Sequence, residues 1–213
     1  MKEEKPATLS QSDELPVFSD LKEAEVAAKN CRRCPLWERG TQTVFGSGAI
    51  QARVLLVGEQ PGDVEDRTGL PFVGPSGRLL NRALEAAQIK RELCYVTNAV
   101  KHFKWEPLGQ RRLHKKPTAR ELQACRPWLQ VEIELVRPEV VVGLGATAAT
   151  SIFGCPVRIA DVRGKLTHIE SVGKTCLITT HPSSVLRAPD PDARQAEFDR
   201  LVQDLMLLKE FVG

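Results

Sequence analysis

Three segments of this chain carry polar side chains that can form hydrogen bonds to a ligand. The first segment is Gly58-Glu59-Gln60-Pro61-Gly62. The second is Asn98 with Thr97 before it, and the third begins with His181-Pro182-Ser183. The amide of Asn98 both donates and accepts hydrogen bonds, so it can read a polar edge. The imidazole of His181 can donate to an atom on which negative charge develops, which lowers the barrier to breaking a bond.

Six cysteines offer a second kind of chemistry. Cys31 and Cys34 form a C-x-x-C pair, and Cys125 supplies a distant third thiol. The sequence starts without the apolar stretch of an export signal, so we expect reduced thiols rather than a disulfide framework. Metal, cluster or plain burial must explain them. Cys94, Cys155 and Cys176 have no partner motif, and we expect them to be structural.

Basic residues are concentrated in one stretch. Seven basic residues and one acidic residue lie between Lys101 and Arg120, a net charge of +6 in a chain whose total is +3. Charge distributed in this way can neutralise several phosphates along one path, which predicts contact with a nucleic-acid backbone. A solvated basic loop is the alternative interpretation.

The polar segments follow apolar runs that read as strands. Runs at 54–57, 94–97, 140–144 and 175–179 are short and β-branched, and helical patterns lie at about 77–89, 119–136, 146–153 and 192–210. Alternating strands and helices predict an α/β fold, a three-layer α/β/α arrangement around a mainly parallel four-stranded sheet. Ligands of such sheets bind beyond the carboxyl ends of the strands, so we expect the polar segments to converge there.

Length and composition predict one domain. The chain has 213 residues, 42% of them hydrophobic, which suffices for one sizeable core. Residues 1–18 read as a disordered tail and residues 19–213 as the domain, with Asp20 capping its first helix. No apolar window is long enough to span a membrane. We expect a cytoplasmic protein and a monomer.

Two of the polar motifs resemble those of the family 4 uracil-DNA glycosylases. Residues 58–62, followed by Gly-Leu-Pro-Phe-Val-Gly-Pro-Ser-Gly at 69–77, are similar to the first motif of that family. His-Pro-Ser-Ser-Val-Leu-Arg at 181–187 is similar to the second, and Thr97-Asn98 lies between them in family order. The resemblance runs from about Cys31 to the last helix. It implies a uracil-DNA-glycosylase-like fold and removal of uracil from DNA, single-stranded and possibly double-stranded.

The resemblance implies a role for each pocket residue. A glycosylase holds a flipped nucleotide in a closed pocket, reading the edge of the base and stacking on its face. Phe72 then provides the stacking face, Asn98 matches the O4 and N3–H of uracil, and His181 donates to O2. The other substrate-binding residues implied are Gly58, Arg112, Ser183 and Arg187.

The same family holds a [4Fe–4S] cluster with four cysteines, and here the pattern departs. His102 stands where a cysteine just after the second strand is expected, so the implied ligands are Cys31, Cys34, His102 and Cys125. Imidazole can replace thiolate on iron, as Rieske centres show. A zinc site with three cysteines and one histidine is equally acceptable by ligand count, and only the resemblance favours iron–sulfur.

Residues 110–114, Gln-Arg-Arg-Leu-His, resemble the Lys-Arg-Arg-Ile-His run of the UdgX branch of these enzymes, differing at the first and fourth positions. The resemblance implies that His114 attacks C1′ of the sugar once uracil has left, which would bind the protein covalently to the abasic DNA. It also implies that Gln60 orders or excludes water, that Glu59 polarises His114 or stabilises the cationic sugar, and that Arg112 braces the loop.

Two other functions stay open on the sequence alone. In the first, the chain is an ordinary multi-turnover family 4-type uracil-DNA glycosylase of base excision repair, and His114 only contacts DNA. In the second, it is a non-catalytic DNA-binding protein organised by zinc. Turnover would separate the first from covalent capture, and metal analysis would separate the second from both enzymes.

Overall fold

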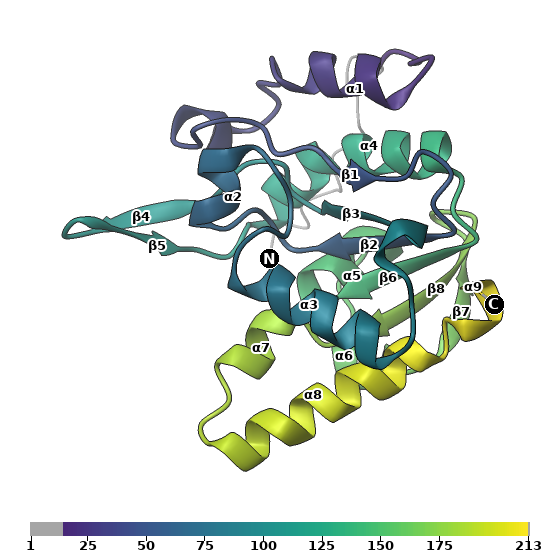
Figure 1. Cartoon of the computed structure of the whole chain (residues 1–213). Coiled ribbons are helices and arrows are strands. Elements are labelled where there is room, and N and C mark those ends of the chain that lie inside the picture. The colour runs from purple at the N-terminus through teal and green to yellow at the C-terminus, as the bar shows by residue number, and fades with distance from the viewer. Residues whose placement is uncertain (1–14, 213) are drawn as a thin grey trace, which may run out of the picture.

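Within residues 15–212, which the computed structural model describes, six strands form the central sheet in the order β1-β3-β2-β6-β8-β7 (Figure 1). The four inner strands are parallel and correspond to the predicted apolar runs: β2 (Val54–Gly58), β3 (Cys94–Asn98), β6 (Val140–Leu144) and β8 (Lys174–Thr179). Every residue of β2, β3 and β6 is buried, which is why these strands are apolar without alternation.

The predicted number of four strands is too low, because the sheet also has two antiparallel edge strands. These are β1 (Ser47–Gly48), paired with β3, and β7 (Leu166–Ile169), paired with β8. Both are short and mostly exposed. Neither contains a continuous apolar run, so the pattern that identified the inner strands did not extend to them.

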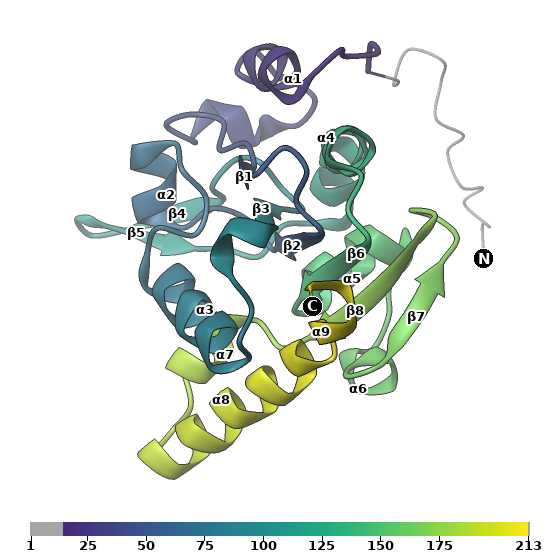
Figure 2. The same ribbon diagram turned by 45° about the vertical axis from the view of Figure 1, so that its right-hand side comes forward.

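Helices cover both faces of the sheet, which confirms the three-layer α/β/α arrangement (Figures 1 and 2). One apolar cluster joins the sheet to α1 (Leu21–Ala28), α4 (Ala119–Val136) and α5 (Ala146–Phe153). A second cluster joins the opposite face to α3 (Pro75–Ala86) and α8 (Pro191–Met206). Neighbouring residues of β2 belong to different clusters, as expected for side chains that alternate between faces.

The stretch predicted as a basic loop contains a two-stranded antiparallel hairpin that projects from the body of the molecule (Figure 1). Its strands are β4 (Trp105–Leu108) and β5 (Arg111–His114), and Gly109 at the tip has a φ of 58°. Glycine adopts that backbone conformation without steric cost, which permits the tight turn.

Short elements complete the described chain. They are η2 (Pro35–Glu38), α2 (Asp63–Thr68), η3 (Arg91–Leu93), α6 (Ile159–Val162), α7 (Pro182–Leu186) and α9 (Lys209–Val212). Among the described residues, no helix combines the length and the apolar character needed to cross a lipid bilayer.

The first described residues include part of the predicted tail. Residues 1–14 of that tail lie outside the described residues. Phe18, in contrast, is buried and its ring stacks on Trp128 of α4, with centroids 5.7 Å apart. Asp20 caps α1 as predicted, because its carboxylate accepts the backbone N–H of Glu23 at 2.8 Å. The packed core therefore includes Phe18.

Replacing Phe18 by alanine should lower the free energy of unfolding by about 3 kcal/mol, because it removes a buried aromatic ring and leaves a cavity beside Trp128. Val17 next to it is 98% exposed, so Val17→Ala should change that free energy by no more than about 0.5 kcal/mol. Denaturant titration of both variants measures the difference. Equal, small changes would mean that Phe18 does not belong to the core.

Candidate functional site

The parallel strands bring the three polar segments to one edge of the sheet, as predicted. Gly58 at the end of β2 is the register partner of Asn98 at the end of β3. On the other side of β2, Leu144 at the end of β6 pairs with Thr179 at the end of β8, two residues before His181. The segments that follow these strands therefore begin side by side.

The side chains of Asn98 and Phe72 meet at Gly58. A Cβ atom placed on Gly58 would lie 2.4 Å from Oδ1 of Asn98 and 2.6 Å from Cζ of Phe72, so only glycine leaves room for both. The ring of Phe72 also faces that of His181, with centroids 6.3 Å apart and planes inclined by 30°. An amide, an aromatic face and an imidazole thus surround one small region of backbone.

Phe72 holds an unusual backbone conformation. Its φ is 57°, in the left-handed region that side chains other than glycine rarely adopt, and such strain persists where the surroundings enforce it. Gly77 in the first turn of α3 contributes, because a Cβ there would lie 1.6 Å from the carbonyl oxygen of Phe72. Glu65 also holds this loop by accepting the N–H of Gly74 at 2.9 Å. The sequence did not indicate the part played by Glu65.

His181 is a buried imidazole whose environment favours the neutral form. Burial lowers its pKa to about 4, and the positive charge of Arg187, and that of His114 when protonated, act in the same direction. The backbone N–H of Ser183 donates to Nδ1 at 3.1 Å, so Nδ1 carries a lone pair and the proton of the neutral ring is assigned to Nε2. Ser183 therefore orients His181, which sets the direction in which Nε2–H donates.

Gln60 fixes the base of the hairpin. Its side chain is 7% exposed, its Oε1 accepts the N–H of Lys104 at 3.2 Å, and its Nε2 reaches the carbonyl oxygens of Lys104 at 3.2 Å and Lys115 at 3.0 Å. Nε2 also lies 2.9 Å from Nε2 of His114. An amide nitrogen has two hydrogens, so these three acceptors share them. Both ends of the hairpin are thereby attached to the loop after β2.

His114 lies between Gln60 and Glu59. Its Nε2 is 3.5 Å from Oε1 of Glu59, and its ring is tilted against that of Phe103 at 5.9 Å. Burial lowers the pKa of His114, while Glu59 raises it and Arg187 lowers it. The other oxygen of Glu59 accepts the hydroxyl of Thr147 in α5, a residue that the sequence gave no reason to select. The imidazole therefore faces a carboxylate that is itself held in place.

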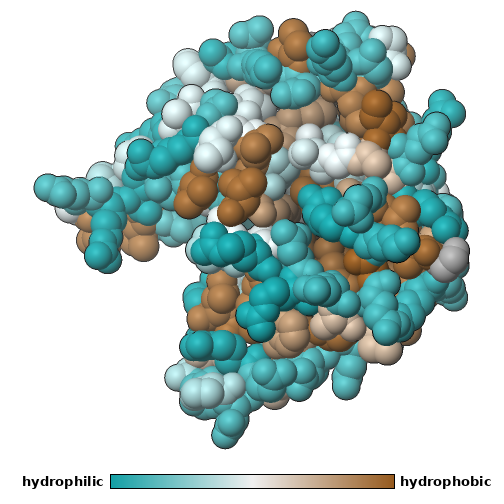
Figure 3. All heavy atoms as spheres, viewed as in Figure 1, coloured by the Kyte–Doolittle hydropathy of each residue, from teal (hydrophilic) through white to brown (hydrophobic). Residues whose placement is uncertain are grey.

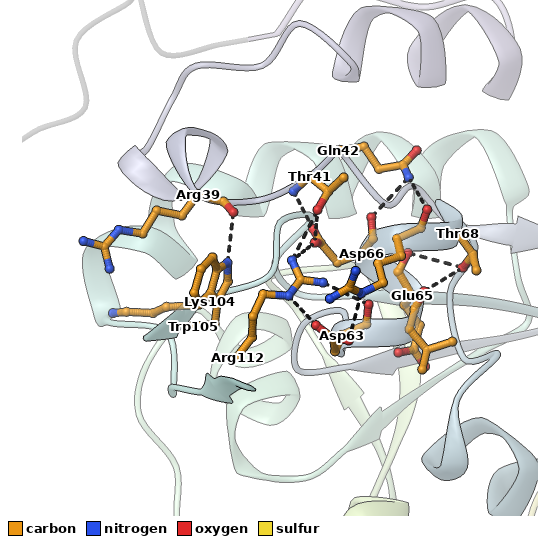
Figure 4. A network of polar contacts seen from close by, with 12 residues as sticks. Arg39, Thr41, Gln42, Asp63, Glu65, Asp66, Thr68, Lys104, Trp105 and Arg112 are labelled. Carbon is orange, nitrogen blue, oxygen red and sulfur yellow. Dashed lines mark hydrogen bonds and ion pairs between the residues drawn. The ribbon is translucent and has the colours of Figure 1, made fainter. Parts of the chain in front are cut away.

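Arg112 braces the hairpin against α2 through carboxylates (Figure 4). Its guanidinium pairs with Asp63 and, at 2.6 Å, with Asp66, and it donates to the hydroxyl of Thr41 at 3.2 Å. The ring of Trp105 lies 5.4 Å from the guanidinium carbon, and the indole N–H donates to the carbonyl oxygen of Arg39 at 2.9 Å. Asp63 and Asp66 are a second contribution that the sequence did not indicate.

Several cations of the predicted basic stretch 101–120 are buried or paired with carboxylates. Lys101 is 1% exposed and pairs with Glu132, so its assignment to a phosphate-binding surface is wrong. Three further cations of the stretch are also paired with carboxylates: Lys104 with Glu121, Arg112 with Asp63 and Asp66, and Lys115 with Glu106. Among the described residues, the exposed cations of this stretch that have no ion pair are Arg111, Lys116 and Arg120.

Three thiols gather beside the N-terminal end of α4. Cys125 is buried, which raises its pKa to about 12, and the neighbouring thiols of Cys34 and Cys31 add to that rise. The indole N–H of Trp128 donates to the sulfur of Cys31 at 3.2 Å. In residues 15–212, no three His, Cys, Asp or Glu side chains are close enough to hold a single metal ion.

His102 is buried next to this segment, and its Nε2 lies 3.0 Å from the hydroxyl of Thr43. Three thiols and one imidazole are a donor set that fits both an iron–sulfur cluster and zinc. Of the remaining cysteines, Cys94 and Cys176 are buried, as expected of structural thiols, but Cys155 is exposed and burial does not explain it.

Comparison with known proteins decides which family this arrangement represents. Residues 45–206 match the family model described as the uracil DNA glycosylase superfamily. The chain belongs to that superfamily. The matched region contains Gly58, Phe72, Asn98, His181, the hairpin, His102 and Cys125, while Cys31 and Cys34 precede it.

Several relatives of this uracil DNA glycosylase superfamily member are named as type-4 enzymes. The "Type-4 uracil-DNA glycosylase" of Thermotoga maritima is 40% identical over 187 residues, covering 86% of this chain and 90% of that protein. Those of Pyrobaculum aerophilum and Archaeoglobus fulgidus are 35% and 37% identical, covering 85% and 75% of this chain and 90% and 80% of theirs. The superfamily member therefore matches these relatives along most of its length.

Proposed function

We propose that this protein excises uracil from DNA, as the names of its type-4 relatives say of them. The observation that carries the proposal is the meeting of Asn98, Phe72 and His181 around Gly58. A flipped base needs a stacking face, an amide for its polar edge and a donor where charge develops, and these three side chains provide them. Gly58 lets the base approach the backbone.

Departure of uracil is assisted at two atoms. The C1′–N1 bond breaks and its electron pair leaves with the base, so negative charge develops on O2 while the sugar becomes cationic. Neutral His181 donates its Nε2 proton in a hydrogen bond to O2, which stabilises that charge. Glu59, held by Thr147, lies on the side of the hairpin and stabilises the cationic sugar.

The surroundings suit a DNA strand. The surface is hollowed between the projecting hairpin and the part of the body below it (Figure 3). Exposed Arg111 lies on the hairpin and exposed Arg187 follows α7, so a strand entering the hollow would pass cations that can pair with phosphates. Ser183 belongs to the same turn. Action as a monomer in the cytoplasm stays a prediction of the sequence.

A second outcome of the reaction is favoured by the position of His114. The names of the relatives support an ordinary enzyme in which water attacks C1′ and the protein turns over. His114, however, lies beside Glu59, and its lowered pKa leaves a neutral ring with an available lone pair. We propose that this lone pair forms an N–C1′ bond after uracil leaves, and that the other ring nitrogen then releases its proton to solvent.

Gln60 permits this attack. The lone pair of Nε2 accepts a hydrogen bond from Gln60 in the free protein, and it must be released before it can react. Because the carbonyl oxygens of Lys104 and Lys115 compete for the same two amide hydrogens, Gln60 can release His114 and keep both hydrogens bonded. Arg112, through its ion pair with Asp66, keeps the hairpin and therefore His114 in position during the reaction.

We further propose that Cys31, Cys34, His102 and Cys125 hold a [4Fe–4S] cluster. The support is the donor set, the influence of the Cys31 and Cys34 thiols on the pKa of Cys125, and the resemblance to the family 4 enzymes. When bound, the cluster would cross-link the segment after α1, the turn after β3 and α4. These residues are far apart in the sequence, so the cluster would fix the three segments relative to one another, including the turn that follows Asn98.

Wild-type protein and a uracil-containing oligonucleotide should yield free uracil and an adduct that survives heat and detergent on a denaturing gel. His114→Ala should abolish the adduct and still release uracil over repeated turnovers, because the histidine acts only after bond cleavage. His168 is exposed and lies on β7, so His168→Ala should behave as wild type. Uracil release without any adduct would refute covalent capture and support an ordinary multi-turnover glycosylase. Absence of uracil release would refute both hypotheses.

Protein purified without oxygen should contain about four irons per chain and absorb visible light. Cys125→Ser and His102→Ala should each lower the iron content, because each removes a proposed ligand, whereas Cys155→Ser should not. Elemental analysis and the visible spectrum measure this. Stoichiometric zinc without iron would contradict the cluster assignment.

A further inference from the structure

Next to Asn98, Lys101 and Glu132 form an ion pair that has no access to solvent. Their side chains are 1% and 0% exposed, and Nζ lies 2.5 Å from Oε2. Desolvating two charges offsets most of their attraction, so a buried pair contributes little net stability compared with a packed apolar pair. Such a pair can instead fix the positions of the groups around it, provided that all its hydrogen bonds are made.

Every hydrogen-bonding position of the pair is used. The ammonium of Lys101 has three hydrogens and three acceptors: Glu132, the hydroxyl of Thr97 at 2.6 Å, and the carbonyl oxygen of Asn98 at 2.8 Å. Glu132 in turn accepts the N–H of Gly46 at 2.8 Å, and it also accepts hydroxyls of Thr97 and Tyr95. Such a saturated network has a single low-energy arrangement.

The network acts directly on Asn98. Lys101 binds the backbone carbonyl of Asn98 from within the turn, and the next residue, Ala99, donates its N–H to the carbonyl oxygen of Gly58 at 2.9 Å. The peptide after Asn98 is therefore held at both its oxygen and its nitrogen. The orientation of this peptide sets the direction in which the Asn98 carboxamide enters the pocket.

Glu132 belongs to α4, the helix that carries Cys125. The backbone N–H of Lys101 donates to the sulfur of Cys125 at 3.2 Å, so the turn from Asn98 to Lys101 is attached to α4 at two points. The pair therefore connects the strand end that carries Asn98 to the helix behind it. Nothing in the residue types of Lys101 or Glu132 indicated this from the sequence.

We propose that Lys101 and Glu132 are positioning residues for Asn98, and that they set the affinity of the pocket for uracil. This inference rests on the proposed function and deepens it. Hydrogen bonds to a base edge depend on placement within a fraction of an ångström, so a small shift of the Asn98 peptide weakens recognition without removing any group that touches the base.

The test compares Lys101→Met with a variant that is equally destabilised elsewhere. Methionine has a similar length but no charge, so the carbonyl of Asn98 loses its donor. The double variant Lys101→Met/Glu132→Gln removes both charges together. It replaces Lys101→Met in the test if the single variant does not fold. Leu205 is fully buried in α8, in the apolar cluster on the opposite face, so Leu205→Ala is the control for lost stability.

Four quantities are measured for each folded variant at equal metal content: uracil excision, inhibition by free uracil, affinity for DNA and the free energy of unfolding. Single-turnover uracil excision and inhibition by free uracil should each weaken by about tenfold or more in the Lys101 variants. Affinity for the same oligonucleotide with thymine in place of uracil should stay at the wild-type value, because the phosphate contacts are untouched. Leu205→Ala should lose stability and keep the wild-type uracil affinity.

Two results would overturn the inference. The first leaves the proposed function intact, and the second overturns it as well. Lys101 variants that bind free uracil and excise it as the wild type does, or no worse than Leu205→Ala, would show that the pair only stabilises the fold. Wild-type protein that neither excises uracil nor binds it would overturn the proposed function together with the inference.

Discussion

The parallel register of β2, β3, β6 and β8 is the constraint on which the site depends. Because Gly58 pairs with Asn98 and Leu144 pairs with Thr179, the chain leaves each strand at the same edge. A slip of one residue would move the following side chain by about 3.3 Å and turn it to the opposite face. Since both faces of these strands are buried against helices, the two apolar clusters oppose such a slip.

The hairpin is positioned by different forces. It shares no strand with the central sheet, and polar contacts hold it instead: Gln60 at its base and Arg112 against α2. Several cations that would otherwise attract DNA are used for this and neighbouring ion pairs, so the electrostatic surface is smaller than the composition of the stretch indicates. In return, His114 is fixed beside Glu59, and the proposed covalent capture would depend on that placement.

The sequence predicted the layers, the inner strands and the convergence of Glu59, Asn98 and His181, because buried strands and their polar ends leave strong local patterns. It did not predict the contributions of Asp66, Thr147 or Glu132, since each acts through a partner far along the chain and none belongs to a local pattern. For the same reason the sequence places Lys101 wrongly among the exposed cations, whereas it is buried and paired with Glu132. A count of lysines cannot distinguish an exposed cation from one whose carboxylate partner lies 31 residues away.

Uracil excision in this account requires that His181 be a neutral donor whose Nε2–H faces the base. Nitrogen-15 NMR of the imidazole, assigned with His181→Asn, reports the tautomer and the titration directly. We predict a neutral ring at pH 7 with the proton on Nε2 and a pKa lowered to about 4. A ring that is cationic at neutral pH, or a neutral ring with its proton on Nδ1, would contradict it.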